Sequence, residues 1–178
     1  MMTEVYEYAR ALFMLSEEEH TTERVYQDIC TVRDAVKSNP DYASLLDTPA
    51  ISKAERVRLI DEAFSALDES VVNLIKILAE RRLSYTLVRL ADDYSALYDE
   101  AHGILRAEAV SAIPLTDEQT ARLTKKLSTL TGKTVILKST TDKSLLGGVK
   151  LRYSGIQLDG SVKTRLDKFE AALKETVV

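Results

Sequence analysis

The feature that most constrains this chain is a change of hydrophobic periodicity at Gly103. Before it, apolar residues recur every three or four positions, the spacing of helices with one buried face. After it, Ile104 to Ile113 has the alternation and length of a strand. A chain of 178 residues can form two small domains. We therefore expect a mainly α protein with a smaller α/β domain: a six-helix bundle over residues 1–103 and an α/β domain over residues 104–178.

The first part predicts six helices with short connections. Asn39-Pro40 is typical of an N-cap followed by proline at the first helical position. Ser52 and Glu55 fit a capping box that opens the fourth helix, with a buried stripe of Val57, Ile60, Phe64 and Leu67. The other expected helices cover residues 4–15, 23–37, 40–46, 70–82 and a segment after Ser84 that runs to Ala101.

The second part predicts a small mixed sheet with two helices. Thr116 and Gln119 form another capping box, and the helix that follows ends at Gly132 in a left-handed C-cap. That helix places Leu123, Leu127 and Leu130 on one face. A strand over residues 134–138 should then pair in parallel with the first strand through a right-handed crossover. The remaining expected elements are a strand from Leu145 to Tyr153, its hairpin partner Ile156 to Leu158, and a last helix that buries Val162, Leu166, Phe169 and Leu173.

The two parts carry charges of opposite sign. The whole chain has a net charge of −4. Through Gly103 there are 11 Lys and Arg against 20 Asp and Glu, a net of −9, and after it 13 against 8, a net of +5. This asymmetry indicates two domains with different partners. It also argues against nucleic acid as a partner of the first domain, because phosphate binding needs clustered Lys and Arg.

The single cysteine and the lengths of the apolar segments indicate where in the cell the protein is located. Cys30 has no second cysteine with which to form an intrachain disulfide, which favours a reducing cytoplasm. The amino terminus lacks the basic and apolar pattern of a signal peptide, and no stretch approaches the roughly 18 apolar residues of a membrane span. We expect no direct membrane insertion, so other subunits would hold the chain at any membrane where it works.

The sequence contains no convincing catalytic, cofactor or metal site. Gly132-Lys133-Thr134 resembles the end of a phosphate-binding loop, but Leu127 stands where such a loop needs glycine, and the triplet follows a helix. His20 and His102 lie in different linkers without neighbouring ligands at metal spacing. Glu17-Glu18-Glu19 is interpreted as a solvated run. We therefore predict no enzyme activity and no cofactor.

Two other features have structural explanations. Arg81-Arg82 lies at the end of the fifth helix, where positive charge complements the helix dipole. Gly147-Gly148 lies inside an expected strand, which predicts a bulge or a close backbone approach there.

Two helices have apolar faces that are too wide for one buried side. On a wheel of about 100° per residue, the sixth helix confines its large apolar residues to roughly 120°, whereas those of the first and fifth spread over roughly 220°. Either both helices lie centrally in the bundle, or their surplus faces form a groove for a partner helix. Periodicity leaves both open, and the small side chains of Ala9 and Ala11 favour the groove slightly.

Four segments carry a resemblance to a known family. They are Tyr8–Phe13, Asn73–Arg82, Val135–Ser154 with its Asp142–Val149 core, and Ile156–Leu166. Together they resemble, in order and over essentially the whole chain, the delta subunit of bacterial F-type ATP synthases. The mitochondrial counterpart is the oligomycin-sensitivity-conferring protein.

The resemblance implies a stator adaptor. In that family the helical domain sits on the catalytic head and holds the amino-terminal helix of an alpha subunit, while the carboxy-terminal domain meets the far end of the b-subunit stalk. The head is thereby kept from turning with the central rotor. The resemblance also implies one copy per complex, a peripheral place on the cytoplasmic face of the cell membrane, and no nucleic acid partner.

The resemblance favours the groove over the central position of the two helices. Carried over by position, it assigns the alpha-subunit site to Tyr8, Ala11, Leu12, Leu15, Asn73, Leu74, Ile77 and Leu78. The positive second domain suits an acidic stalk end, without naming its contact residues. Gly147, Gly148 and Gly160 match the family as fold determinants.

Two other functions are alternatives to the stator adaptor. Helical RNA-binding modules of the antitermination type are also compact bundles, but the net charge of −9 on the first domain counts against this alternative. An enzyme with a phosphate site at Lys133 is the third hypothesis, and nucleotide protection of that lysine would support it.

Overall fold

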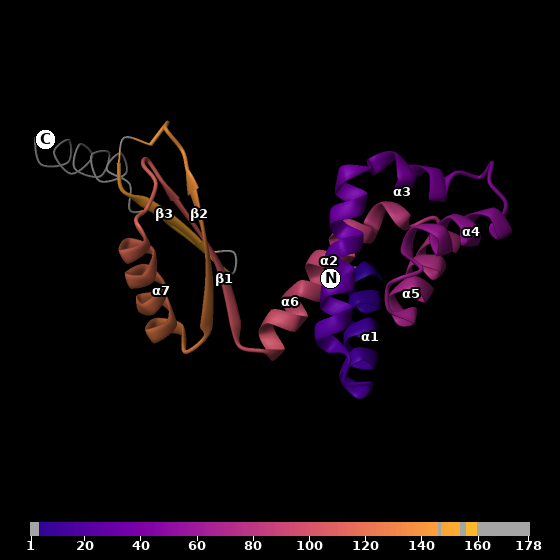
Figure 1. Cartoon of the computed structure of the whole chain (residues 1–178), viewed down its shortest axis with the longest axis horizontal. Helices are drawn as coiled ribbons and strands as arrows, with labels where there is room; N and C mark the ends of the chain where they lie inside the picture. The colour runs from indigo at the N-terminus through magenta and orange to yellow at the C-terminus, as the bar shows by residue number, and fades with distance from the viewer. Residues whose placement is uncertain (1–3, 146, 154–155, 160–178) are drawn as a thin grey trace, which may run out of the picture. The chain divides into compact units, whose positions relative to one another are not determined.

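The computed structural model describes residues 4–145, 147–153 and 156–159. The chain divides into two compact units, Met1–Tyr98 and Asp99–Val178, which we describe separately. Across the described residues there are seven α-helices and one four-stranded mixed sheet (Figure 1). The chain is therefore mainly helical with a smaller α/β part. The six-helix bundle and the roles of the two domains stay predictions.

The helices of the first unit occupy the expected ranges with small differences. They are α1 (Glu4–Glu18), α2 (Thr22–Ser38), α3 (Pro40–Asp47), α4 (Lys53–Phe64), α5 (Glu69–Glu80), the short 3-10 helix η1 (Ser84–Thr86) and α6 (Leu87–Ala101). α1 runs beyond Leu15 and takes in Glu17 and Glu18, which are exposed as a solvated run should be. α4 ends at Phe64, so Leu67 lies outside the helix in which the sequence placed it.

α5 is the most extensively packed helix of the first unit. It contacts α1, α2, α3 and α4. Its buried side chains are Val71, Val72, Leu74, Ile75, Leu78 and Ala79. The predicted stripe of α2 is also buried throughout, at Val25, Ile29, Val32 and Val36. The central place of α5 accounts for most of its wide apolar face.

Two predicted helix starts differ from the structure in their side chains. Asn39 occupies the N-cap position of α3, but its side chain makes no cap bond there. Instead its Nδ2 donates to the Ala35 carbonyl of the preceding helix, 3.2 Å away. Ser52 Oγ accepts from the Glu55 amide at 3.2 Å, which is half of the capping box. The other half is not formed, since the Glu55 carboxylate accepts from Arg58.

Arg56 is a buried cation that the periodicity of α4 did not indicate. Its Nε donates to the Leu46 carbonyl at 2.6 Å, and its Nη2 donates to the Thr48 carbonyl at 3.2 Å. Carbonyls at the end of a helix have no partner within the helix. Arg56 therefore satisfies the end of α3 and holds α4 against it.

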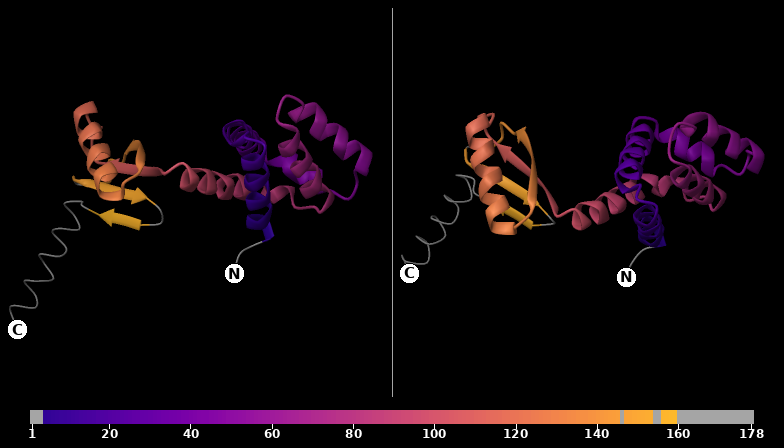
Figure 2. Two further views of the ribbon diagram at one scale, coloured as in Figure 1. Left: turned by 90° about the horizontal axis from the view of Figure 1, so that it is seen from below. Right: turned by 60° about the horizontal axis from the view of Figure 1, so that its bottom comes forward.

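The second unit is a sheet with a helix on one face. Its elements are β1 (Ile104–Ser111), α7 (Asp117–Thr131), β2 (Thr134–Thr141), β3 (Val149–Tyr153) and β4 (Ile156–Asp159), and the strand order is β2-β1-β3-β4. β1 and β2 are parallel, as predicted, and the other pairs are antiparallel. α7 lies along one face of the sheet in every view (Figures 1 and 2).

The ends of α7 match the sequence, but one residue of its face does not. Thr116 and Gln119 form both halves of the capping box, and Gly132 caps the helix with φ of 69°. Lys133 therefore follows a helix end, as expected, and Thr134 begins β2. Leu127 is buried in the core, whereas Leu130 is 73% exposed. The shared face predicted for Leu123, Leu127 and Leu130 is therefore covered only in part, since the core includes Leu127, with Leu123 packed against it, and does not include Leu130.

The strand before the hairpin is shorter than expected. β3 begins at Val149, not at Leu145. Gly147 and Gly148 lie ahead of it with φ of 151° and 85°. Positive φ values are readily adopted only by glycine, so the pair serves a turn into the strand and not a bulge within it. The expected last helix, with Val162, Leu166, Phe169 and Leu173, lies outside the described residues.

Two kinds of feature are absent from the described part of the chain, a membrane-spanning helix and a metal-binding cluster. There, no helix is both long and apolar enough to cross a bilayer. Within the same residues, no group of three or more His, Cys, Asp or Glu side chains is arranged to hold a metal ion.

A candidate helix-binding groove

A groove lies between α1 and α5. The two helices run in opposite directions, since Glu4 at the start of α1 forms an ion pair of 3.2 Å with Arg81 just after α5. Between them is a hollow of about 270 Å³. It is lined by Tyr8, Ala11, Leu12 and Leu15 of α1 and by Ser70, Asn73, Leu74 and Ile77 of α5.

The structure brings seven of the eight residues named from the sequence into this lining. Leu15 and Ile77 are 40% and 46% exposed, which is high for large apolar side chains. Ala11 and Asn73 are exposed, and Tyr8 is half-buried. The other two of these seven residues, Leu12 and Leu74, are mostly buried. Leu78 is fully buried and does not line the hollow.

Helical spacing explains why these side chains meet. On α1, Tyr8, Ala11 and Leu15 are three or four positions apart and so share one face. On α5, Asn73 and Ile77 are related in the same way. Ala11 lies at the middle of the α1 face, and its small methyl side chain leaves space in the groove for another helix. The surplus apolar surface predicted for the two helices thus lies in one place.

Ser70 is a lining residue that the sequence reasoning missed. It lies four positions before Leu74, so helical spacing puts it on the same face of α5. Neither the apolar pattern nor the positions assigned by the resemblance included it. Ser70 and Asn73 make one wall of the groove partly polar.

The Tyr8 end of the groove is fixed by Arg81. The Arg81 guanidinium lies 5.8 Å from the centre of the Tyr8 ring, within cation–π range. The same guanidinium pairs with Glu4. These contacts join the start of α1 to the end of α5 and neutralise charge at that end.

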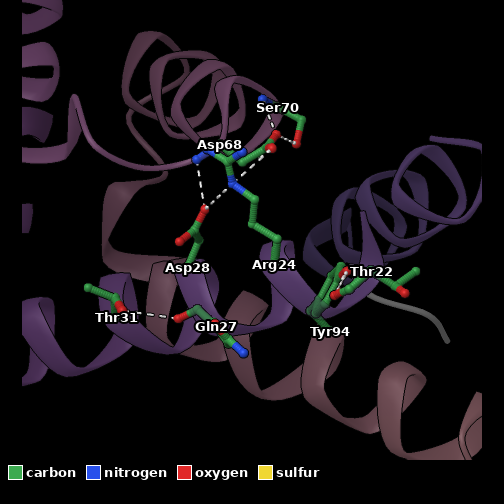
Figure 3. Close-up of polar contacts among 8 residues, drawn as sticks. All are labelled: Thr22, Arg24, Gln27, Asp28, Thr31, Asp68, Ser70 and Tyr94. Atoms are coloured by element: carbon green, nitrogen blue, oxygen red, sulfur yellow. Dashed lines mark hydrogen bonds and ion pairs between the residues drawn. The ribbon is translucent and has the colours of Figure 1, made fainter. Parts of the chain in front are cut away.

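The Ser70 end of the groove is fixed by a cluster of acidic residues around Arg24 (Figure 3). Asp68 caps α5, since it accepts from the Ser70 amide at 3.1 Å and from its hydroxyl at 2.7 Å. Asp28 of α2 accepts from the Asp68 amide at 2.7 Å. Arg24 Nε lies 3.6 Å from Asp68 and 4.0 Å from Asp28. The first turn of α5 is thereby tied to α2.

Tyr94 of α6 supports the same end from inside the unit. Its hydroxyl lies 2.9 Å from Ser16 Oγ, and Ser16 in turn donates to the Phe13 carbonyl at 2.7 Å. The Tyr94 ring meets Phe13 edge to face, with 5.7 Å between the ring centres. Burial is the main cause that raises the pKa of Tyr94 to about 12.

The raised pKa of Tyr94 makes stability sensitive to alkali. Because the folded pKa lies above the ordinary value of 10, the contribution is complete below pH 10 and is lost as the pH rises from 10 to 12. We expect the free energy of unfolding to fall over that window by about 2 kcal/mol more in the wild type than in Tyr94→Phe. Urea titrations at pH 9 to 12 measure this difference. Parallel curves for the two proteins would contradict it.

Comparison with known proteins places this geometry in a family. The family model described as "ATP synthase delta (OSCP) subunit" matches residues 5–173. The chain belongs to this delta-subunit family. It is therefore a component of the peripheral stalk of an F-type ATP synthase, a structural subunit and not the catalytic one.

Individual relatives agree along nearly the full length. The chain is 35% identical over 173 residues to ATP synthase subunit delta of Clostridioides difficile, an alignment that covers 96% of the chain and 95% of the relative. It is 35% identical to the delta subunit of Anaeromyxobacter dehalogenans, with 94% and 95% covered. Among solved structures, a chain of the Toxoplasma gondii mitochondrial ATP synthase hexamer superposes with a TM-score of 0.78 at 25% identity, over 97% of this chain and 98% of that one.

Membership of the delta-subunit family distinguishes between the three functions considered from the sequence. It supports the stator adaptor, and neither the RNA-binding module nor the phosphate-site enzyme gains support from any of these relatives. The structure also leaves Lys133 at a helix end and not at the start of a helix, where a phosphate loop would need it.

Proposed function

We propose that this chain ties the catalytic head of the ATP synthase to the b stalk, so that the head does not turn with the rotor during proton-driven ATP synthesis. In this proposal the groove between α1 and α5 holds the amino-terminal helix of the alpha subunit, and the second unit binds the carboxy-terminal end of the b subunit. One copy acts in each complex, on the cytoplasmic face of the cell membrane.

The observation that carries the proposal is the partly exposed apolar lining of the groove. Leu15 and Ile77 keep 40% and 46% of their surface exposed beside Ala11, although Leu12 and Leu74 at the floor of the same groove are buried. An amphipathic helix is the recognition element that lays an apolar face into such a groove. Burial of apolar surface stabilises this kind of complex by about 25 cal/mol per Å² before ordering costs. Holding a stator together requires slow dissociation and no reactive group.

Calorimetric titration of the full chain with a synthetic peptide tests the groove. The peptide is the amino-terminal segment of the alpha subunit of the same complex, and a peptide of scrambled order is the control. We expect saturable binding of one peptide per chain with a negative heat-capacity change, the mark of apolar burial. The scrambled peptide should not bind. Equal binding of both peptides, or of neither, would contradict the proposal.

The second unit is proposed as the b-stalk partner on the basis of its charge. Residues 104–178 carry 13 Lys and Arg against 8 Asp and Glu, which suits an acidic segment. Stepwise dissociation of the purified complex tests this assignment. The chain should stay with the b subunits when the alpha peptide is added in excess, and should leave with the head when b is removed.

A further inference from the structure

One end of the groove is acidic. Glu18 lies three positions after Leu15 and seven after Ala11, so it continues the groove-lining face of α1. Glu69 lies four positions before Asn73 and continues the α5 face in the same direction. Both carboxylates are exposed, as is Glu17, and across the described residues none of the three forms an ion pair.

Negative charge is also concentrated just inside that end. The side chains of Asp28 and Asp68 are only 16% and 14% exposed, and they share a single guanidinium, that of Arg24 (Figure 3). One cation therefore only partly compensates two carboxylates. Burial is the main cause of the raised pKa of Tyr94, and the charges of Glu17 and Asp68 add to that rise, in keeping with carboxylates of α1 and of the α5 cap lying on the same side of the unit. Because the two helices run in opposite directions, the negative pole of α1 and the positive pole of α5 oppose each other at this end, so the acidity comes from the side chains.

The opposite end of the groove is close to neutral. There Arg81 pairs with Glu4 and lies over the Tyr8 ring, and Arg82 follows it as an exposed cation. Glu80 pairs with Lys53 at 2.6 Å. The groove therefore has an electrostatic direction along its length, although its apolar lining is continuous from Tyr8 to Leu15.

We propose that this polarity fixes the direction in which the partner helix lies in the groove. The end of the helix that carries more Lys and Arg lies beside Glu18 and Glu69, and its apolar face covers Ala11, Leu15 and Ile77. Apolar burial alone would accept a helix in either direction, because it is non-directional. Charge complementarity across a rim supplies orientation and association rate more than affinity. The inference rests on the proposed function, since it concerns the occupant of the same groove.

Spin labels on the partner helix test the direction. The probe is the synthetic amino-terminal peptide of the alpha subunit, labelled with a nitroxide at one end or the other and added to the full chain enriched in 15N. The label at the more basic end should broaden the amide signals of Leu15 and Ser70. The label at the other end should broaden those of Tyr8 and Ile77. The reverse pattern, or equal broadening at both ends, would overturn the inference.

Charge removal tests the cause of the direction. The double variant Glu18→Gln with Glu69→Gln should raise the Kd for the peptide by about fivefold, mainly through slower association. It should also make that Kd less dependent on salt. The matched control is Glu7→Gln with Glu80→Gln, which removes two exposed acids from the same helices at the other end and should change Kd less than about twofold. Equal effects of the two pairs would count against the inference. Failure of the wild type to bind would instead refute the proposed function.

Discussion

Replacing Ala11 with aspartate is expected to weaken binding of the alpha-subunit peptide at least about a hundredfold. Ala11 is exposed at the middle of the α1 face of the groove, so in the free chain the new carboxylate would be solvated. In the complex it would be buried against the apolar face of the peptide, where an unpaired charge costs several kcal/mol, and each 1.4 kcal/mol is about tenfold in affinity. Calorimetric titration gives the Kd.

Met14→Asp is the matched control for that result. Met14 is on the same helix and is 51% exposed, but it does not line the groove. The Met14→Asp variant should therefore bind the peptide with an affinity close to that of the wild type. Both variants should keep the helicity of the wild type, since one exposed Asp in a helix costs only about 0.7 kcal/mol or less. Unchanged affinity in Ala11→Asp would remove the groove from the mechanism.

Replacing Arg56 with methionine is expected to lower the free energy of unfolding by about 3 kcal/mol. Methionine keeps the apolar stem of the side chain but leaves the buried carbonyl of Leu46 and the partly buried carbonyl of Thr48 without their donor. A lost charge-assisted hydrogen bond costs about 1.5 to 3 kcal/mol, and an unsatisfied buried carbonyl adds to it. Urea denaturation followed by circular dichroism measures the change.

Arg58→Met is the control for Arg56. Arg58 is on the same helix, is exposed, and among the described residues pairs with Glu55 and Glu62 alone. Exposed pairs contribute little, so we expect a change below about 0.5 kcal/mol. If Arg56→Met were as stable as Arg58→Met, the hydrogen bonds to the end of α3 would not stabilise the first unit.

Features set by neighbouring residues were predicted well from the sequence. The capping box of Thr116 and Gln119 and the left-handed Gly132 depend on a few consecutive residues, and the structure has both. Where two local partners competed, the position of the cap was predicted correctly but its side-chain hydrogen bond was not. The Asn39 side chain was expected at the start of α3, but the end of α2 offered a carbonyl to the same amide group.

Features set by distant residues could not be predicted in this way. In the sequence, Arg56 is simply a charged residue of α4. Its burial depends on the carbonyls at the end of α3, which lie beside it only in the folded chain. The cluster of Asp28 and Asp68 joins two residues that are forty positions apart in the chain. Leu130 has the correct helical spacing for burial, but spacing does not tell where the sheet beneath it ends.

The groove falls between these two cases. The width of the apolar faces of α1 and α5 indicated more apolar surface than one buried side needs. The resemblance to the delta-subunit family then assigned particular residues to the groove. Periodicity could not separate Leu78, which is fully buried, from Ile77, which is exposed, because both lie on the same wide apolar arc of α5. The two side chains are about 100° apart on the wheel, and only the neighbouring helices decide which part of the arc is covered.

The order of strands in the sheet has a consequence for synthesis on the ribosome. β1 is the inner strand that pairs with both β2 and β3, and both partners come later in the chain, from Thr134 and Val149. The nascent β1 therefore emerges as an unpaired apolar segment and waits for more than twenty further residues before any strand can join it. The helices up to Tyr98 have their own contacts and need none of these strands to begin folding. Chaperones that recognise nascent chains should accordingly engage the segment from Ile104 to Ser111 during translation.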